Sequence, residues 1–157
     1  MKKIDITALL IHIIAAELVG ALSALFAGGF TGLYAIIKQP PLSPPPAVFP
    51  IVWTILYALM GASAYIIFAQ ETNSRKQHIA VGLYAIQLTV NFLWSIIFFR
   101  FEAFFLAALT AVLLAVLVAA MVFAFSKVSK IAALINLPYL AWSLFAAYLA
   151  LGVWILN

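Results

Sequence analysis

The sequence KQPPLSPPPAVFPIVW occupies residues 38–53 and separates the first two long apolar stretches of the chain. Proline fixes φ, removes a backbone donor and disfavours the α region for the residue before it. Pro40-Pro41 and Pro44-Pro45-Pro46 should therefore run extended or polyproline-like. Because a flexible linker would be rich in glycine and serine instead, this segment predicts a rigid, non-helical lid over one end of the helices that it joins.

The composition places the chain in a lipid bilayer. Of its 157 residues, 68% are hydrophobic and 8% are charged, and the mean hydropathy is +1.24. These values lie outside the range of an ordinary soluble domain. The net charge of +4 comes from Lys and Arg scattered over loop positions, so nucleic acid is not an expected partner. Cysteine is absent, which excludes disulfides, thiol chemistry and Cys-ligated metals.

Five apolar segments are each long enough to cross the hydrocarbon core as a helix. They occupy approximately residues 6–27, 47–69, 79–99, 103–125 and 131–156. In lipid, a helix satisfies its own backbone N–H and C=O groups. The sequence therefore predicts an all-α integral membrane protein, with residues 1–157 forming one five-helix transmembrane bundle and a proline-rich loop between helices 1 and 2. Short breaks predict that the third, fourth and fifth spans are sequential antiparallel neighbours.

The basic residues predict how the bundle is oriented. Two Lys or Arg residues, Lys38 and Arg100, fall on one side of the spans, and six fall on the other: Lys2, Lys3, Arg75, Lys76, Lys127 and Lys130. The positive-inside rule then places the N-terminus in the cytoplasm and the proline loop and C-terminus outside. The N-terminal run also resembles a secretory signal. Because Asp5, His12 and Glu17 interrupt it, we expect it to be retained as the first span.

Stripes of aromatic and polar side chains recur at helical spacing on three spans. They comprise Phe49, Trp53, Tyr57 and Met60 on the second span, Tyr84, Gln87, Asn91, Trp94 and Phe98 on the third, and Tyr139, Trp142, Ser143, Ala146 and Ala150 on the fifth. One interpretation is an aromatic belt at the headgroup level, with the amides joining helices by hydrogen bonds. Because Gln87 and Asn91 lie inward of such a belt, the set as a whole favours a pocket for a large, flat ligand.

Glu17 is the only carboxylate deep in a span, where an ionisable group costs about 2.5–3.5 kcal/mol. It is either a functional carboxylate or a carboxyl hydrogen-bonded where small residues let helices approach. No catalytic triad, carboxylate pair, phosphate loop or metal cluster is evident in the sequence. The fourth span, with Thr110 as its only polar member, is predicted to be a lipid-facing buttress without chemistry. Pro138 predicts a kink in the fifth span.

Together these motifs resemble the tryptophan-rich sensory protein and translocator protein family (TspO/MBR, which includes the peripheral benzodiazepine receptor), and specifically its bacterial-type members. The run from Gln39 to Tyr57 is similar to the family's first loop and second helix. Gln87-Leu88 with Asn91 and Trp94 resembles its third helix. The fifth helix is matched by Leu137-Pro138-Tyr139-Leu140-Ala141-Trp142 with Phe145-Ala146. The resemblance covers the chain from Tyr34 to about Trp154.

The resemblance implies a receptor or carrier in the bacterial cell membrane, commonly a homodimer, that binds porphyrin or haem under the first loop and requires no other cofactor. The ligand-binding residues would be Tyr34, Phe49, Trp53, Tyr57, Gln87, Asn91, Trp94, Tyr139, Trp142 and Ala146. An alternative is light-dependent degradation of protoporphyrin, with Trp53 and Trp142 as the catalytic residues. A further alternative, from residue chemistry alone, is proton-coupled export of aromatic cations dependent on Glu17.

Three departures from the family pattern bear on these expectations. Gln39 stands where lysine is usual, so pairing of that position with a porphyrin propionate is not expected, although Lys38 is adjacent. Leu151 and Ile155 stand where a cholesterol-recognition pattern needs tyrosine and a basic residue, which disfavours cholesterol as the ligand. The small-residue step of the third helix reads Gly82 to Ile86, which weakens the expected dimer contact on that face.

Overall fold

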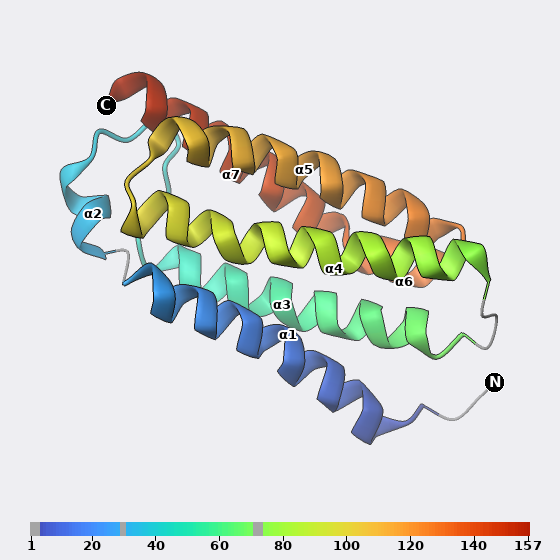
Figure 1. Cartoon of the computed structure of the whole chain (residues 1–157). Helices are drawn as coiled ribbons and strands as arrows, with labels where there is room; N and C mark the ends of the chain where they lie inside the picture. The colour runs from blue at the N-terminus through green and yellow to red at the C-terminus, as the bar shows by residue number, and fades with distance from the viewer. Residues whose placement is uncertain (1–3, 29–30, 71–73) are drawn as a thin grey trace.

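The computed structural model describes residues 4–28, 31–70 and 74–157, which form a bundle of five long helices (Figure 1). The long helices are α1 (Ile6–Ala27), α3 (Val48–Phe68), α4 (Arg75–Ser95), α5 (Phe104–Ser126) and α7 (Leu137–Leu156). Three short elements complete the described fold: α2 (Thr31–Ile36), the π-helical turn η1 (Ile96–Arg100) and α6 (Lys130–Ile135). Because no strand occurs among the described residues, the predicted all-α class is confirmed.

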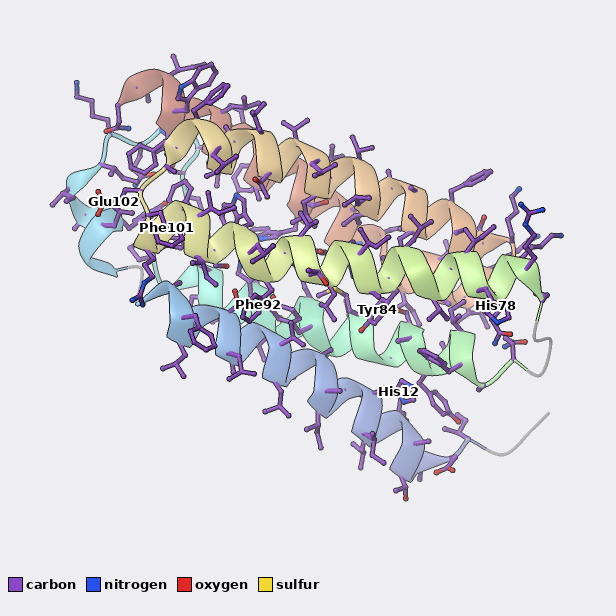
Figure 2. All side chains as sticks on the ribbon, in the orientation of Figure 1. His12, His78, Tyr84, Phe92, Phe101 and Glu102 are labelled. Carbon is purple, nitrogen blue, oxygen red and sulfur yellow. The ribbon has the colours of Figure 1, made fainter. Side chains whose placement is uncertain are left out.

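Five spans in the described residues are long and apolar enough to cross a membrane: residues 6–27, 48–68, 75–100, 104–126 and 130–156. They match the predicted spans to within a few residues. Large apolar side chains cover much of the outer surface, whereas several polar side chains are buried: Ser23, Ser63, Gln87, Asn91, Asn136 and Ser143. Figure 2 shows polar atoms gathered at the two ends of the bundle, with His78 at one and Glu102 at the other. This distribution suits lipid as the surrounding solvent.

Helix α5 packs between α4 and α7, so the third, fourth and fifth spans are neighbours in chain order, as predicted. One face of α5 is buried and rich in alanine, including Ala107, Ala108 and Ala111. The opposite face exposes large apolar side chains such as Leu113 and Val116. One face of α5 is thus apolar and exposed, as predicted for a lipid-facing buttress, and the small side chains on its other face allow both neighbouring helices to approach closely.

The fifth span is divided where a kink was predicted. Helix α6 ends at Ile135, and Pro138 lies in the first turn of α7. Proline there lacks a donor and crowds the preceding turn, so the helix is interrupted two residues before it, at Asn136. The Asn136 Nδ2 atom donates to the Ala132 carbonyl oxygen at 2.9 Å and satisfies one acceptor at the break. In the first turn of α7, the Tyr139 side chain is fully buried in the bundle.

Candidate ligand-binding site

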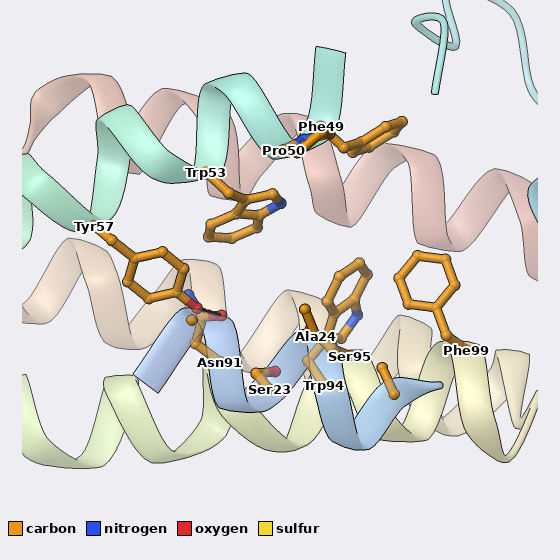
Figure 3. Close-up of a pocket in the computed structure, with 12 residues that line it drawn as sticks. Ser23, Ala24, Phe49, Pro50, Trp53, Tyr57, Asn91, Trp94, Ser95 and Phe99 are labelled. Atoms are coloured by element: carbon orange, nitrogen blue, oxygen red, sulfur yellow. Dashed lines mark hydrogen bonds between the residues drawn. The ribbon is translucent and has the colours of Figure 1, made fainter. Parts of the chain in front are cut away.

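A cavity of about 130 Å³ lies between α1, α3 and α4 near the start of α3 (Figure 3). Its lining is Gly20, Ser23, Ala24, Ala27, Phe49, Pro50, Trp53, Tyr57, Asn91, Trp94, Ser95 and Phe99. Figure 3 shows Trp53 and Trp94 extending from α3 and α4 toward the space between these helices. The cavity is thus mostly apolar, with a few polar groups along one wall, which is the usual character of a small-molecule site.

A second cavity, of about 30 Å³, lies beside the first and extends to α7. Four side chains line both cavities and form what we call the aromatic partition: Phe49, Trp53, Trp94 and Phe99. The rest of the second lining comes mainly from α7 and from the segment around α2: Tyr34, Gln39, Phe98, Trp142, Ala146, Leu149, Ala150 and Val153. A rotation of the partition side chains would therefore join two spaces that together reach from α1 to α7.

A buried hydrogen-bond network lies along the wall of the first cavity. The Tyr57 hydroxyl donates to Asn91 Oδ1 at 3.1 Å, and Asn91 Nδ2 donates to the Tyr139 hydroxyl oxygen at 2.8 Å. The Tyr139 hydroxyl donates in turn to Gln87 Oε1 at 2.7 Å, and Gln87 Nε2 contacts Met60 Sδ at 3.8 Å. These contacts join α3, α4 and α7 and fix the Asn91 amide in one orientation, because each buried polar group needs its partner.

Eight of the ten predicted ligand-binding residues line one or both cavities. They are Tyr34, Phe49, Trp53, Tyr57, Asn91, Trp94, Trp142 and Ala146. Gln87 and Tyr139 line neither cavity, and both are 0% exposed. They lie behind Asn91 and hold it in place through the network, and their direct contact with the ligand stays a prediction.

The first helix contributes a wall that the aromatic stripes did not predict. Gly20, Ser23, Ala24 and Ala27 of α1 all line the first cavity. A Cβ atom added at Gly20 would collide with the Tyr57 ring, so the glycine is what allows that ring to lie against α1. The signal was present in the sequence as a row of small residues, whose lack of volume leaves the space open.

The π-helical turn η1 adds two phenylalanines to the lining. The Phe101 N–H donates to the Ile96 carbonyl oxygen at 3.1 Å, an i to i+5 bond in place of the α-helical pattern. Phe98 and Phe99 are consecutive, with ring centroids 4.7 Å apart, and both line the second cavity. A period of 3.6 residues predicted Phe98 on the face of the helix that carries the site, but not Phe99. The wider π-helical turn rotates Phe99 onto that face as well.

Trp94, in the partition, and Trp142, beside it, differ in how their indole rings are held. Trp94 Nε1 donates to the Ala107 carbonyl oxygen of α5 at 3.1 Å, which fixes its ring. Trp142 Nε1 is buried and has no hydrogen-bond partner among the described residues. The Trp142 ring lies 6.1 Å from Phe49, centroid to centroid, beside the second cavity. A buried donor without a partner costs free energy, which a ligand acceptor would recover.

The proline segment, residues 38–47, contributes Gln39 to the lining of the second cavity and is fastened to α2 and α7. The Tyr34 hydroxyl donates to the Pro44 carbonyl oxygen at 2.6 Å, and the Tyr148 hydroxyl of α7 donates to that of Pro41 at 2.7 Å. Burial raises the pKa of Tyr34 above its ordinary value, so this hydroxyl stays a donor. Pro40 packs on Gly152, where an added Cβ would lie 2.5 Å from the Pro40 Cβ.

One turn within the proline segment is held in a backbone conformation that its residue disfavours. The Ser43 N–H donates to the Pro40 carbonyl oxygen at 3.3 Å and closes a turn in which Leu42 has φ +67°. A left-handed conformation at a residue other than glycine costs about 1–2 kcal/mol. Leu42 is also 83% exposed, so no packing of its side chain accounts for that cost. Strain of this kind is typical of segments that move when a ligand binds.

Glu17 lies on α1 outside both cavities and forms no hydrogen bond with another described residue. It is half-buried, and the two roles expected from the sequence both stay predictions. No group of three or more His, Asp or Glu side chains among residues 4–28, 31–70 and 74–157 has the arrangement of a metal site.

Comparison with known proteins gives this arrangement a family. The model of the TspO/MBR family matches residues 10–155. The chain is 36% identical over 124 residues to the tryptophan-rich protein TspO of Chlorobaculum tepidum, covering 79% of this chain and 78% of that protein. It is 31% identical over 153 residues to protein CrtK of Rhodobacter capsulatus, covering 98% and 94%. It is 34% identical over 138 residues to the translocator protein of Ovis aries, covering 81% and 82%. Because both the family match and these relatives cover most of its length, the chain belongs to the TspO/MBR family.

Proposed function

We propose that this membrane protein is a receptor or carrier that binds a tetrapyrrole, a porphyrin or haem, beneath the proline segment. The observation that carries the proposal is the aromatic partition, four rings that line both cavities at once. A porphyrin offers a wide π-face on both sides, and aromatic rings pack on such a face by offset stacking or edge-to-face contact. Asn91 and the unpartnered Trp142 Nε1 supply polar contacts at the edges.

The size of the cavities sets a condition on this binding. At about 130 and 30 Å³ they are smaller than the roughly 300–1,000 Å³ typical of sites for drug-sized ligands. A tetrapyrrole therefore requires rotation of the partition rings and displacement of the proline segment. Lys38, which is exposed at the start of that segment, would meet a propionate once the ligand has entered.

The proposal is tested by titrating the detergent-purified protein with protoporphyrin IX in the dark, following tryptophan fluorescence and the porphyrin absorbance band. Trp53→Phe should weaken binding about tenfold, because a partition indole contributes both stacking area and shape. Trp154→Phe is the matched control, since Trp154 contacts Phe105 on the outer surface and lines neither cavity. Absence of saturable binding, or equal losses in the two variants, would rule out this site.

Light-dependent degradation of protoporphyrin is a second candidate, favoured by the location of two indoles. Trp53 and Trp142 both line the second cavity, so one bound ligand would contact both rings. Illumination of the porphyrin complex would then bleach the porphyrin band and give a new absorbance. This product should disappear in a Trp53→Phe/Trp142→Phe variant that still binds porphyrin. Product formation that persists in this variant would make the two indoles bystanders.

No contact of Glu17 favours the third candidate, proton-coupled export.

The orientation in the membrane is also a proposal. Figure 1 shows α2 and the C-terminus at one end of the bundle, opposite the start of α4 and the turn between α5 and α6. We place the latter end in the cytoplasm, since it carries Arg75, Lys76, Lys127 and Lys130; Lys2 and Lys3 lie outside the described residues. The natural chain has no cysteine. We expect Ser43→Cys to be labelled from outside intact cells and Ser126→Cys to be labelled only after permeabilisation.

Cross-linking in the membrane would test the predicted homodimer.

A further inference from the structure

The outer surface between α4 and α5 carries an apolar groove that the tetrapyrrole site does not use. The groove has a volume of about 300 Å³ and is lined by Ile79, Leu83, Ala120, Phe123 and Ala124, together with Lys76 and Lys127. Its lining residues follow one another at steps of three and four on both helices, so the groove runs along the helix axes. From Ala120 to Lys127 it extends about 10 Å, at a rise of roughly 1.5 Å per residue.

The same two lysines also line a more polar cleft at the end of the groove. This cleft, of about 430 Å³, is bounded by Ser74, Arg75, Lys76, Lys127 and Val128. Lys76 lies in the first turn of α4, and Lys127 caps the C-terminal end of α5. Cleft and groove thus share Lys76 and Lys127 in their linings, with the cleft toward the end of the bundle and the apolar side chains of the groove toward its middle.

No acidic residue neutralises these cations in the described part of the chain. Neither the cleft nor the groove is lined by Asp or Glu, and neither lysine forms an ion pair with a described residue. Lys127 Nζ lies 4.5 Å above the centroid of the Phe123 ring, itself part of the groove. This cation–π contact holds the ammonium at the boundary between the polar and apolar parts.

We propose that this surface binds one anionic phospholipid, with its phosphate between Lys76 and Lys127 and the first part of an acyl chain in the groove. Charge complementarity selects the headgroup, because Lys76, Lys127 and Arg75, with no Asp or Glu in the described lining, attract an anion at the membrane surface. The groove selects a lipid over a free anion, since inorganic phosphate would leave the apolar lining unfilled. Both helices are membrane spans, so an acyl chain parallel to them already has the right direction.

The test uses the full chain, purified in a neutral detergent, with three probes: phosphatidylglycerol, phosphatidylcholine with the same acyl chains, and inorganic phosphate. Native mass spectrometry counts bound lipid, and thermal unfolding gives the affinity. Only phosphatidylglycerol is expected to remain bound and to raise the unfolding temperature. A Lys76→Gln/Lys127→Gln variant should bind it about tenfold or more weakly. The matched control, Arg100→Gln/Lys130→Gln, removes the same charge at two positions that line neither the cleft nor the groove and should bind normally.

A second variant tests the groove without changing any charge. Ala120→Trp fills the apolar part and should weaken phosphatidylglycerol binding to a similar extent, with an unchanged circular dichroism spectrum. Four results would overturn the proposal: unchanged binding in the double-lysine variant, an equal loss in the Arg100/Lys130 control, stabilisation by phosphate alone, or an Ala120→Trp variant that separates a dimer and leaves lipid binding intact. The last result would show that a second copy of the chain covers the groove.

Discussion

The side-chain amide of Asn157 brackets the backbone of Lys38 with two hydrogen bonds. Its Oδ1 accepts from the Lys38 N–H at 2.9 Å, and its Nδ2 donates to the Lys38 carbonyl oxygen at 3.0 Å. The same Nδ2 also lies 2.8 Å from the Val153 carbonyl oxygen of α7. The residue at the end of the last helix thus fastens the beginning of the proline segment, 119 positions away in sequence. Any opening of that segment at this end has to break the pair.

Removing this contact should loosen the proline segment without unfolding the bundle. Asn157→Ala deletes both bonds, each worth about 1 kcal/mol, so exchange of the Lys38 amide should become up to about thirtyfold faster. Hydrogen exchange followed by mass spectrometry on the peptide that covers residues 38–43 measures the change. Gln70→Ala, which removes a side-chain bond to the Ile66 carbonyl oxygen after α3, is the control. Equal exchange rates in the wild type and Asn157→Ala would show that other contacts hold the segment.

Two glycines with opposite surroundings should respond oppositely to alanine. A Cβ at Gly61 would lie 2.5 Å from the Ile13 Cα and 2.6 Å from the His12 carbonyl oxygen, both backbone atoms of α1. Gly61→Ala should therefore force α1 and α3 apart and cost about 1–3 kcal/mol. Gly82 has no atom within 4 Å of its added Cβ, so Gly82→Ala should stabilise helix α4 by up to about 1 kcal/mol. Thermal unfolding in detergent measures both changes, and a stable Gly61→Ala variant would contradict the close packing of α1 on α3.

The sequence predicted the fold well because the bilayer imposes a simple rule on length and hydropathy. The helix ends were predicted less accurately for a physical reason. Helix α4 begins at Arg75, four residues before the predicted span, because Ser74 caps it by accepting from the Gln77 N–H at 3.3 Å. The first turn of this helix is polar, so a span predicted from apolar residues alone starts too late in the sequence. The same holds for α6, which Ser129 caps.

The sequence predicted the parts of the candidate site that large side chains form. It missed the parts that depend on backbone geometry or on small residues. Helical spacing shows on which face of a helix a residue lies but not how close its side chain comes to a cavity. The sequence therefore could not distinguish Asn91, which lines the cavity, from Gln87, which lies behind it. The π-helical turn that brings Phe99 into the lining breaks the period on which the prediction relied. Small α1 residues such as Ser23 carry no chemistry of their own and become part of a wall only through packing.

The buried network should make one tyrosine hydroxyl far more important to stability than another. Tyr139→Phe leaves Asn91 Nδ2 without its acceptor and Gln87 Oε1 without its donor, both inside the bundle. Leaving buried polar groups unpaired costs about 1–3 kcal/mol. Tyr84→Phe removes a hydroxyl on α4 that forms no hydrogen bond with a described residue and should be nearly neutral. Thermal unfolding of the two variants decides the point, and equal unfolding temperatures would contradict the assigned network.

A larger side chain at position 146 should close the second cavity and block the proposed ligand. Ala146 lines a space of only about 30 Å³, and Leu there would occupy the path along which the two cavities must join. Overpacking that costs about 1–3 kcal/mol in the bound state corresponds to an affinity lowered about tenfold or more. Ala141→Leu, on the exposed face of the same helix and outside both cavities, is the matched control. Protoporphyrin titration of both variants distinguishes the outcomes, because unchanged affinity in Ala146→Leu would place the ligand outside these cavities.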